Sequence, residues 1–303
     1  MAYDRIMDYP GLFAEHVLPE KANSINLSFM VDKLSVEFGG TAGNIAYNLA
    51  LLAESPIIIG SVGQDFAAYK SHLLLMGIDT TSVRVLEGVL TSSASVFTDK
   101  EDNQIAAFYP GAGGVGYDTP VVTEGRALAI VSPGCIYDMT QLPQQYRRSN
   151  FKYLFDPGQQ TIALTPEALR DGITGASVVF GSDYEIGLIA QRTGWTEDEI
   201  LQHTPVLVVT YGSKGSRVRT RDGEVQVPVT TPDRVADPTG AGDSFRAGFI
   251  KGMLAGFSHE GCARLGSVVA SYCIEKHGTQ NHTFTMDQLK ARYQKAYNEE
   301  LKL

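Results

Sequence analysis

The chain has 303 residues, of which 43% are hydrophobic and 19% are charged, a composition typical of a folded globular protein rather than a disordered one. Its formal net charge of −9 argues against a nucleic-acid-binding surface, because such a surface needs clustered Lys and Arg. The sequence has no apolar run long enough to span a membrane and no N-terminal segment that resembles a signal peptide, so we expect a cytoplasmic protein without membrane contacts.

Short apolar runs alternate with segments of helical periodicity along most of the chain. Runs rich in β-branched residues predict buried strands at 57–62, 126–133, 152–157, 177–182 and 206–213. Helices are predicted at 42–54, 65–76, 184–192, 196–203, 241–256, 259–276 and 286–299. This alternation indicates an α/β fold, with a mostly parallel sheet covered by helices on both faces.

Two further segments have a different pattern. Residues 3–38 and about 82–115 contain shorter and more polar strands, such as SASVFTD and NQIAAFYP. Strands of this kind suit a small antiparallel sheet with one solvated face, which could form a lid beside the main sheet. Because no linker or repeat interrupts the sequence, we predict a single domain over residues 1–303.

The glycine-rich segment GAGGVG at 111–116 fits the dinucleotide-binding pattern G-x-G-x-x-G. That pattern has to open a helix, and the following residues YDTPVV do not begin one. We therefore interpret the segment as a turn. The sequence also lacks the G-x-x-x-x-G-K-[ST] motif of P-loop enzymes.

The segment DPTGAGDSFRAGFI at 237–250 carries the clearest chemical signal. Phe245, Phe249 and Met253 recur every four residues and predict a helix with this face buried. Glycines at its start leave backbone N–H groups that favour an anion, and Asp243 lies in the same turn. Asp243 could be a helix cap alone. A carboxylate beside an anion-binding helix end also suits phosphoryl transfer, because it can accept the proton of an attacking hydroxyl.

A second glycine cluster, FGGTAGNIAYNLALL, lies at 38–52. Gly39 and Gly40 precede a predicted helix, and either tight packing or a ligand site would explain them. In a ligand site, Asn44 would act as hydrogen-bond donor and acceptor. The residues alone favour neither interpretation.

Together, the two glycine clusters resemble the two signatures of the ribokinase-like (PfkB) family of carbohydrate and nucleoside kinases. Further segments resemble the family in order along the chain: AYDRIMDYPG, DNQIAAFYPGA, AIVSPG, LFDPGQQ, VVTYGSKGS and CIEKHGTQNHTF. The resemblance covers essentially the whole chain and is strongest to the prokaryotic adenosine kinase-like branch. It implies a three-layer α/β/α sandwich with a central, mostly parallel sheet and a small β-sheet lid.

The resemblance also implies roles at the phosphate end of the site. Asp243 matches the catalytic base that activates the acceptor hydroxyl. The matching anion-hole residues are Gly240, Ala241 and Gly242. The residues that match the loop bordering ATP are Thr210, Gly212 and Gly215.

At the acceptor end, Asp4 matches the carboxylate that binds two sugar hydroxyls, a task for which two carboxylate oxygens are suited. Gly39, Gly40 and Asn44 match the turn that contacts the sugar. Phe108 lies on the predicted lid and could stack on a nucleobase, although an ordinary place in the lid core explains it equally well.

Two features depart from the family. The family's N-x-x-E motif, which acts on Mg²⁺ largely through water, is SDYE here, so Ser182 replaces Asn and Glu185 is retained. We expect Ser182 and Glu185 to contact Mg²⁺ mainly through water, with Asp183 as a possible substitute. The family also has a full first strand before the substrate-binding Asp, whereas three residues precede Asp4. We therefore expect the central sheet to lack most of one strand.

The implied activity is an ATP- and Mg²⁺-dependent kinase that phosphorylates the primary hydroxyl of a nucleoside. Adenosine, phosphorylated at the 5′ oxygen, is the preferred acceptor. A sugar kinase of the ribokinase or fructokinase type is the alternative, and a catalytically impaired nucleoside-binding relative is a third reading. The resemblance allows either a monomer or a homodimer formed through the lid.

Overall fold

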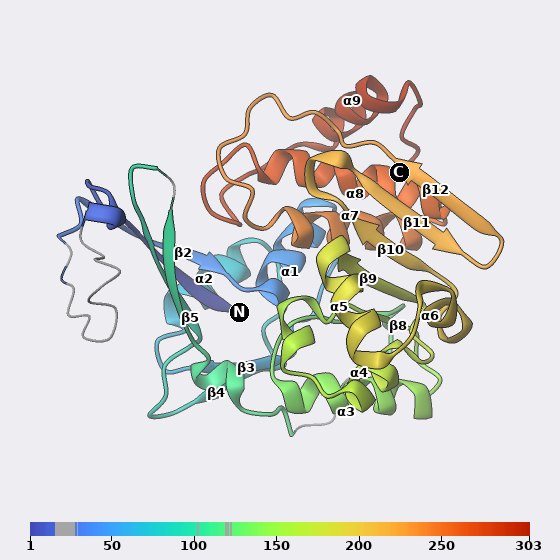
Figure 1. Cartoon of the computed structure of the whole chain (residues 1–303), viewed down its shortest axis with the longest axis horizontal. Helices are drawn as coiled ribbons and strands as arrows, with labels where there is room; N and C mark the ends of the chain where they lie inside the picture. Colours follow the sequence, from blue (N-terminus) through green and yellow to red (C-terminus); the bar gives the residue numbers. More distant parts are fainter. Residues whose placement is uncertain (16–27, 29, 102, 119–120, 122) are drawn as a thin grey trace.

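The computed structural model of the chain describes residues 1–15, 28, 30–101, 103–118, 121 and 123–303. A six-stranded sheet forms its middle layer (Figure 1). In spatial order the strands are β12 (Gly223–Val227), β11 (Ser216–Thr220), β10 (Leu207–Thr210), β9 (Val178–Ser182), β8 (Tyr153–Phe155) and β7 (Ala129–Val131). Strands β7 to β10 run parallel, and β11 and β12 add an antiparallel hairpin.

Helices cover both faces of this sheet. One face carries α3 (Ile136–Arg148), α4 (Pro166–Ile173), α5 (Asp183–Thr193) and α6 (Glu197–His203). The other carries α1 (Thr41–Leu51), α7 (Ala241–Leu254) and α8 (His259–Cys273), with α9 (Met286–Tyr297) packed on α8. The strands contribute side chains to the cores on both faces, because successive side chains point to opposite faces of the sheet. Tyr153 and Phe155 pack in the first core, and Leu154 packs in the second. The predicted α/β/α sandwich is confirmed.

A second, four-stranded sheet forms the lid beside this body (Figure 1). Its spatial order is β2 (Lys33–Gly39), β1 (Ala2–Asp8), β5 (Ser93–Thr98) and β6 (Gln104–Tyr109). The prediction of a wholly antiparallel lid is wrong, because β1 and β5 pair in parallel, with Tyr3 opposite Ser93. Residues 16–27, 29 and 102 of the predicted lid lie outside the described residues.

A two-stranded parallel sheet of β3 (Gly60–Gly63) and β4 (Val83–Leu86) packs with α2 (Ala67–Leu75). The lid sheet therefore omits β4, although the predicted lid range included it. The GAGGVG segment forms a short 3-10 turn at Gly111–Gly114, as its sequence context predicts. In the described part of the chain, β1 pairs only within the lid, so the six-stranded sheet ends at β7.

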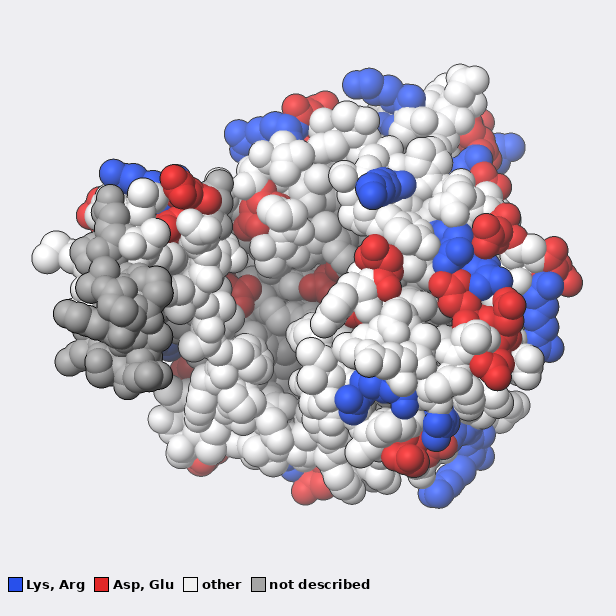
Figure 2. All heavy atoms as spheres, viewed as in Figure 1, with Lys and Arg blue, Asp and Glu red and all other residues white. Residues whose placement is uncertain are grey.

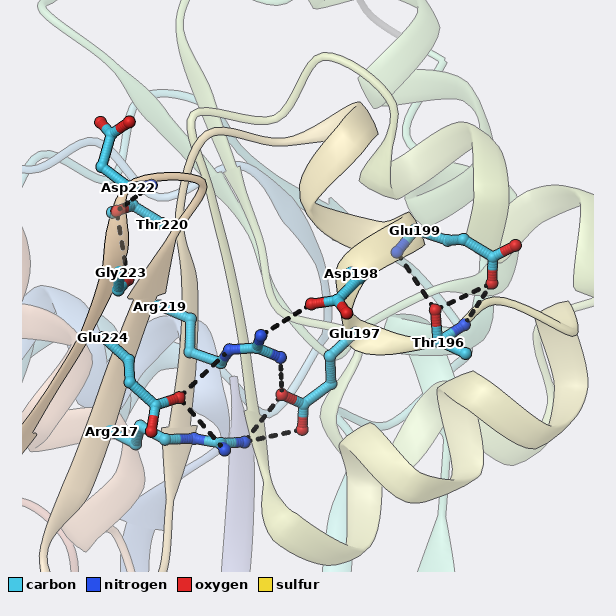
Figure 3. A network of polar contacts seen from close by, with 10 residues as sticks. All are labelled: Thr196, Glu197, Asp198, Glu199, Arg217, Arg219, Thr220, Asp222, Gly223 and Glu224. Atoms are coloured by element: carbon cyan, nitrogen blue, oxygen red, sulfur yellow. Dashed lines mark hydrogen bonds and ion pairs between the residues drawn. The ribbon is translucent and has the colours of Figure 1, made fainter.

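A network of ion pairs joins the β11–β12 hairpin to the start of α6 (Figure 3). Glu197 accepts hydrogen bonds from Arg217, at 2.7 Å, and from Arg219. Arg219 also donates to Asp198 at 2.7 Å and lies 3.3 Å from Glu224 on β12. The network holds the hairpin that follows the Gly212–Gly215 loop against the main body.

No helix among the described residues is both long and apolar enough to cross a membrane.

Candidate active site

A pocket of about 250 Å³ opens where the parallel strands of the central sheet end. Pro133, Asp156, Ser182 and Thr210 line it, and they lie at or just beyond the ends of β7, β8, β9 and β10. Open α/β sheets bind ligands at this edge. Figure 2 shows a hollow between the lid and the main body, with acidic side chains visible inside it.

Asp243 lines this pocket from the first turn of α7. The helix forms where its periodicity predicts, and Phe245 and Phe249 are buried beneath it. Gly240, the residue that precedes the helix, has φ +80°, and a Cβ there would lie 2.8 Å from the methyl group of Thr279. The position therefore requires glycine. Gly240 and Gly242 line the pocket, whereas the Ala241 N–H donates to the Pro238 carbonyl at 3.3 Å.

The Asp243 carboxylate is held by a residue from a different part of the chain. Asn44 Nδ2, on α1, donates to Asp243 Oδ2 at 2.7 Å. Burial raises the pKa of Asp243 to about 6, while the Asn44 hydrogen bond and the nearby Arg246 cation act in the opposite direction. A carboxylate with a pKa near neutrality is well matched to accepting a proton from a hydroxyl.

A buried ion pair lies beside Asp243 in the same pocket. Arg246 Nη2 donates to Asp156 Oδ1 at 2.7 Å, and the guanidinium lies 5.6 Å from the centre of the Phe180 ring. A Cβ at Gly242 would be 2.8 Å from Arg246 Nη1, so the cation borders the glycine turn. The sequence interpretation missed both charged residues. Their only signals were an Asp directly after a buried strand and an Arg within an otherwise buried helix face.

Asp4 lies on β1 of the lid sheet, outside the lining of this pocket, and is near enough to Asp243 for its charge to raise the pKa of that carboxyl. A Cβ at Gly39 would lie 2.1 Å from Asp4 Oδ2, so the carboxylate occupies the space that a side chain at position 39 would need. Gly40 has φ +82°, and its Cβ would meet the backbone of β1. Both glycines thus let the end of β2 pack closely against β1. Burial raises the pKa of Asp4 to about 6.

Phe108 lies on the same face of the lid as Asp4. In the ladder, Asp4 is opposite Ala94 on β5, and Ala94 is opposite Phe108 on β6, and residues in register share a face. Two strand spacings separate Phe108 from Asp4, or roughly 10 Å. The Phe108 ring is 63% exposed, so it is not part of a lid core.

The predicted ATP-bordering residues lie at the end of β10, which Thr210 closes, and in the loop that follows it. Thr210 lines the pocket, and Gly212 begins a short 3-10 turn with φ +56°. Gly215 has φ +91°, and a Cβ there would be 2.2 Å from the Val227 carbonyl oxygen. The glycine at 215 is therefore required for packing against β12, while Thr210 faces the site.

Ser182 and Glu185 line the pocket and also bind each other. Ser182 Oγ accepts from the Glu185 amide at 3.2 Å, and Glu185 Oε2 accepts from the Ser182 amide at 2.7 Å. This reciprocal pair is a capping box at the start of α5. It leaves Oε1 of Glu185 outside the cap. Among the described residues, no group of three His, Cys, Asp or Glu side chains is arranged to hold a metal ion.

The chain matches one protein family and is similar to nucleoside kinases of known sequence and structure. Residues 9–285 match the model of the pfkB family carbohydrate kinases. The chain is 30% identical to a nucleoside kinase of Methanocaldococcus jannaschii, over 91% of this chain and 92% of that one. It is 36% identical to Burkholderia thailandensis nucleoside kinase solved with inosine, with a TM-score of 0.87 over 100% of this chain and 97% of that one.

The fold is shared more widely than the sequence. Arabidopsis thaliana ribokinase, solved with ribose and ATP, is 18% identical and gives a TM-score of 0.75, with 96% of each chain covered. At this identity the likeness shows a common fold and nothing about the acceptor.

Proposed function

The chain belongs to the pfkB family of carbohydrate kinases, and we propose that it transfers the γ-phosphoryl group of ATP to the 5′ hydroxyl of a nucleoside. The observation that carries the proposal is the position of Asp243. Its carboxylate lies in the first turn of α7, is held by Asn44 at 2.7 Å, and faces a pocket at the ends of the parallel strands.

In the proposed mechanism, Asp243 accepts the proton of the acceptor hydroxyl as the oxygen attacks the γ-phosphorus. The bond between the γ-phosphorus and the β–γ bridging oxygen breaks, and ADP leaves with the electron pair. The backbone N–H groups around Gly240 to Gly242 stabilise the charge on the transferring group, because the start of α7 is an anion-binding helix end. The Arg246 cation beside Gly242 adds positive charge to the same region. Most of the catalysis then comes from positioning and electrostatics, as in other phosphoryl transfers.

Asp4 is the proposed anchor for the acceptor. Its carboxylate enters the site from the lid and can accept hydrogen bonds from two vicinal hydroxyls, such as the 2′ and 3′ hydroxyls of ribose. Its close packing on Gly39 fixes the position of the carboxylate relative to the Asn44 helix. The ribose would then direct its 5′ hydroxyl toward Asp243.

The pocket fits a Mg²⁺ ion held by phosphate oxygens and water rather than by a full set of protein ligands. Glu185 and Ser182 line the pocket and would hold the ion through water. When bound with ATP, Mg²⁺ would neutralise charge on the phosphates.

A purine nucleoside, with adenosine preferred, is the proposed acceptor. Two observations support a nucleoside over a free sugar. Phe108 offers an exposed aromatic ring on the substrate side of the lid, roughly one nucleoside length from Asp4. Nucleoside kinases are also among the relatives with 30% and 36% identity, and the second of these was solved with inosine.

The experiment that tests the proposal is a phosphoryl-transfer assay with ATP and Mg²⁺ across adenosine, inosine, cytidine, ribose and fructose. Turnover concentrated on nucleosides supports the proposed acceptor, and the ratio of adenosine to inosine decides between purines. Turnover on free sugars alone would keep the mechanism and overturn the acceptor. Nucleoside binding without turnover on any acceptor would indicate a catalytically impaired binding protein.

A further inference from the structure

A chain of directed hydrogen bonds runs behind the Asn44–Asp243 pair. Asn44 Oδ1 accepts from Gln280 Nε2 at 2.9 Å and from Thr279 Oγ1 at 2.8 Å. Gln280 Oε1 in turn lies 3.0 Å from His72 Nε2. Asn44, Thr279 and Gln280 are all at most 4% exposed, so these bonds form away from bulk water.

The donors and acceptors allow one orientation of each amide. The Gly39 carbonyl only accepts, so the Tyr69 hydroxyl donates to it and must accept from the Gln280 amide nitrogen. The Gln280 oxygen then faces His72, which makes His72 the donor. This leaves the Gln280 nitrogen facing Asn44, and the Gln280 nitrogen also donates to the Tyr69 hydroxyl. The Asn44 oxygen therefore accepts from Gln280, and its nitrogen is the group that meets Asp243. The Thr279 hydroxyl has one hydrogen, which it can give either to the Asn44 oxygen or to the Phe38 carbonyl. If the Asn44 amide were reversed, its oxygen would face the Asp243 carboxylate, and two hydrogen-bond acceptors would meet.

The same cluster is attached to the lid. Tyr69 donates from its hydroxyl to the Gly39 carbonyl at 2.8 Å, and the Thr279 hydroxyl lies 3.0 Å from the Phe38 carbonyl. Both carbonyls belong to the end of β2, and Gly39 also packs against Asp4. The cluster thus joins the helix of Asn44, the lid strand and the loop before α9, so its side chains have little freedom to rotate.

We propose that Gln280 and Thr279 are positioning residues that act on Asp243 through Asn44. By filling the acceptor side of the Asn44 amide, they keep its N–H directed at the carboxylate, which holds that carboxylate ionised and aimed at the acceptor hydroxyl. The inference rests on the proposed role of Asp243 as the base. It adds two residues, 36 and 37 positions beyond Asp243 in the sequence, to the residues that control the base.

The expected signature is a change in proton affinity. A hydrogen bond to the charged form of a carboxylate lowers its pKa, and loss of that bond raises it. The other charged or titratable groups that influence or border Asp243 are Arg246, Asp156, Asp4, Tyr69, Cys273 and the Met1 amino group. The substitutions below leave these residues in place. Gln280→Met also removes a hydrogen-bond partner of the titratable His72 and Tyr69 side chains, whereas the Thr279 variants leave both of those bonds intact and report the Asn44 contact.

The test uses Gln280→Met, which removes the donor at similar volume, and the pair Thr279→Val and Thr279→Ser, of which only Ser keeps the hydroxyl. Gln202→Met, on the exposed side of α6, is the matched control. We expect the acid limb of the kcat/KM pH profile to move up by about one pH unit in Gln280→Met and Thr279→Val, with activity recovering at higher pH. Thr279→Ser and Gln202→Met should keep the wild-type limb.

An unmoved limb in folded Gln280→Met and Thr279→Val would overturn the inference. If Gln280→Met does not fold, the Val and Ser variants at 279 decide alone. A second readout does not depend on turnover: the carboxyl carbon signal of Asp243, identified by its loss in Asp243→Asn, is titrated by NMR. A raised pKa in the variants of an enzyme that phosphorylates no nucleoside would support the inference and reject the proposed function.

Discussion

Asn44 Nδ2 lies 2.7 Å from Asp243 Oδ2, although 199 positions separate the two residues in the chain. The contact exists because α1 and α7 pack side by side on one face of the central sheet. Each helix begins after a glycine with positive φ, Gly40 for α1 and Gly240 for α7. Two separate glycine turns therefore bring one amide and one carboxylate together at the pocket.

Replacement of Asp243 by Asn should abolish turnover while nucleoside binding survives, because the amide keeps the shape but cannot accept the proton. We expect kcat to fall by about 10²-fold to 10⁴-fold, with the dissociation constant measured by calorimetry changed little. The control is Asp287→Asn, in the first turn of the exposed end of α9. A similar loss in both variants would show that helix charge, rather than a base, is responsible.

Asp4→Asn should stabilise the fold at neutral pH. The pKa of Asp4 in the folded state is raised to about 6, above the ordinary value of about 4. Between these values the folded state binds more protons than the unfolded state, so the contribution of Asp4 to stability falls as pH rises toward 7. The melting temperature of Asp4→Asn should exceed that of the wild type at pH 7.5, and the gain should shrink toward pH 4.5.

The control for this measurement is Asp8→Asn, because Asp8 is an exposed residue at the end of the same strand. It should change the melting temperature little at either pH. The same gain for Asp4→Asn at both pH values would mean that the raised pKa is not its cause.

Asp4→Asn should also weaken nucleoside binding more than ATP binding in titration calorimetry.

Breaking the Asp156–Arg246 pair should be costly. Both side chains are at most 7% exposed, so Arg246→Met leaves a buried carboxylate without its partner and should lower the free energy of unfolding by about 3–5 kcal/mol. The double variant Asp156→Asn with Arg246→Met should recover much of that loss in urea denaturation. Glu260→Gln, which breaks the more exposed pair with Arg264, should cost less than about 1 kcal/mol. Additive losses in the double variant would contradict the pairing.

Phe108→Ala should raise KM for adenosine and leave turnover of ribose, if any, unchanged. Loss of base stacking is worth about 1–3 kcal/mol per base, or roughly 5-fold to 150-fold in affinity. Tyr109→Ala is the matched control, because Tyr109 is its neighbour on β6, is 48% exposed and points to the opposite face. Equal effects of the two variants would place the base elsewhere.

Local patterns predicted the elements whose signals are contained within a few residues. The helix after Gly240 was predicted from the spacing of Phe245, Phe249 and Met253. Helix α3 was not predicted, because it contains Pro143 and a polar run, and its position is set by packing on β7 and β8. The S-x-x-E pattern of Ser182 and Glu185 is itself a sequence signal for a capping box, but the resemblance to the family directed attention to a metal.

The contacts between distant segments could not be predicted from residues alone. Nothing near Asn44 indicates Asp243, and only the family resemblance brought the two clusters together. Gln280 and Thr279 had no local signal, because their function depends on the direction of two side-chain amides in the folded state. The resemblance marked their segment as part of the family without giving either residue a role.

The contact between Asp4 and Gly39 has an evolutionary consequence. A methyl group at position 39 would have to occupy the place of an Asp4 oxygen, 2.1 Å away, so the glycine can vary only after the carboxylate has gone or moved. Substitutions at the two positions therefore have a fixed order: position 4 has to change before position 39. A descendant that loses the Asp4 carboxylate becomes free to lose Gly39, whereas one that loses Gly39 first must displace that carboxylate in the same step.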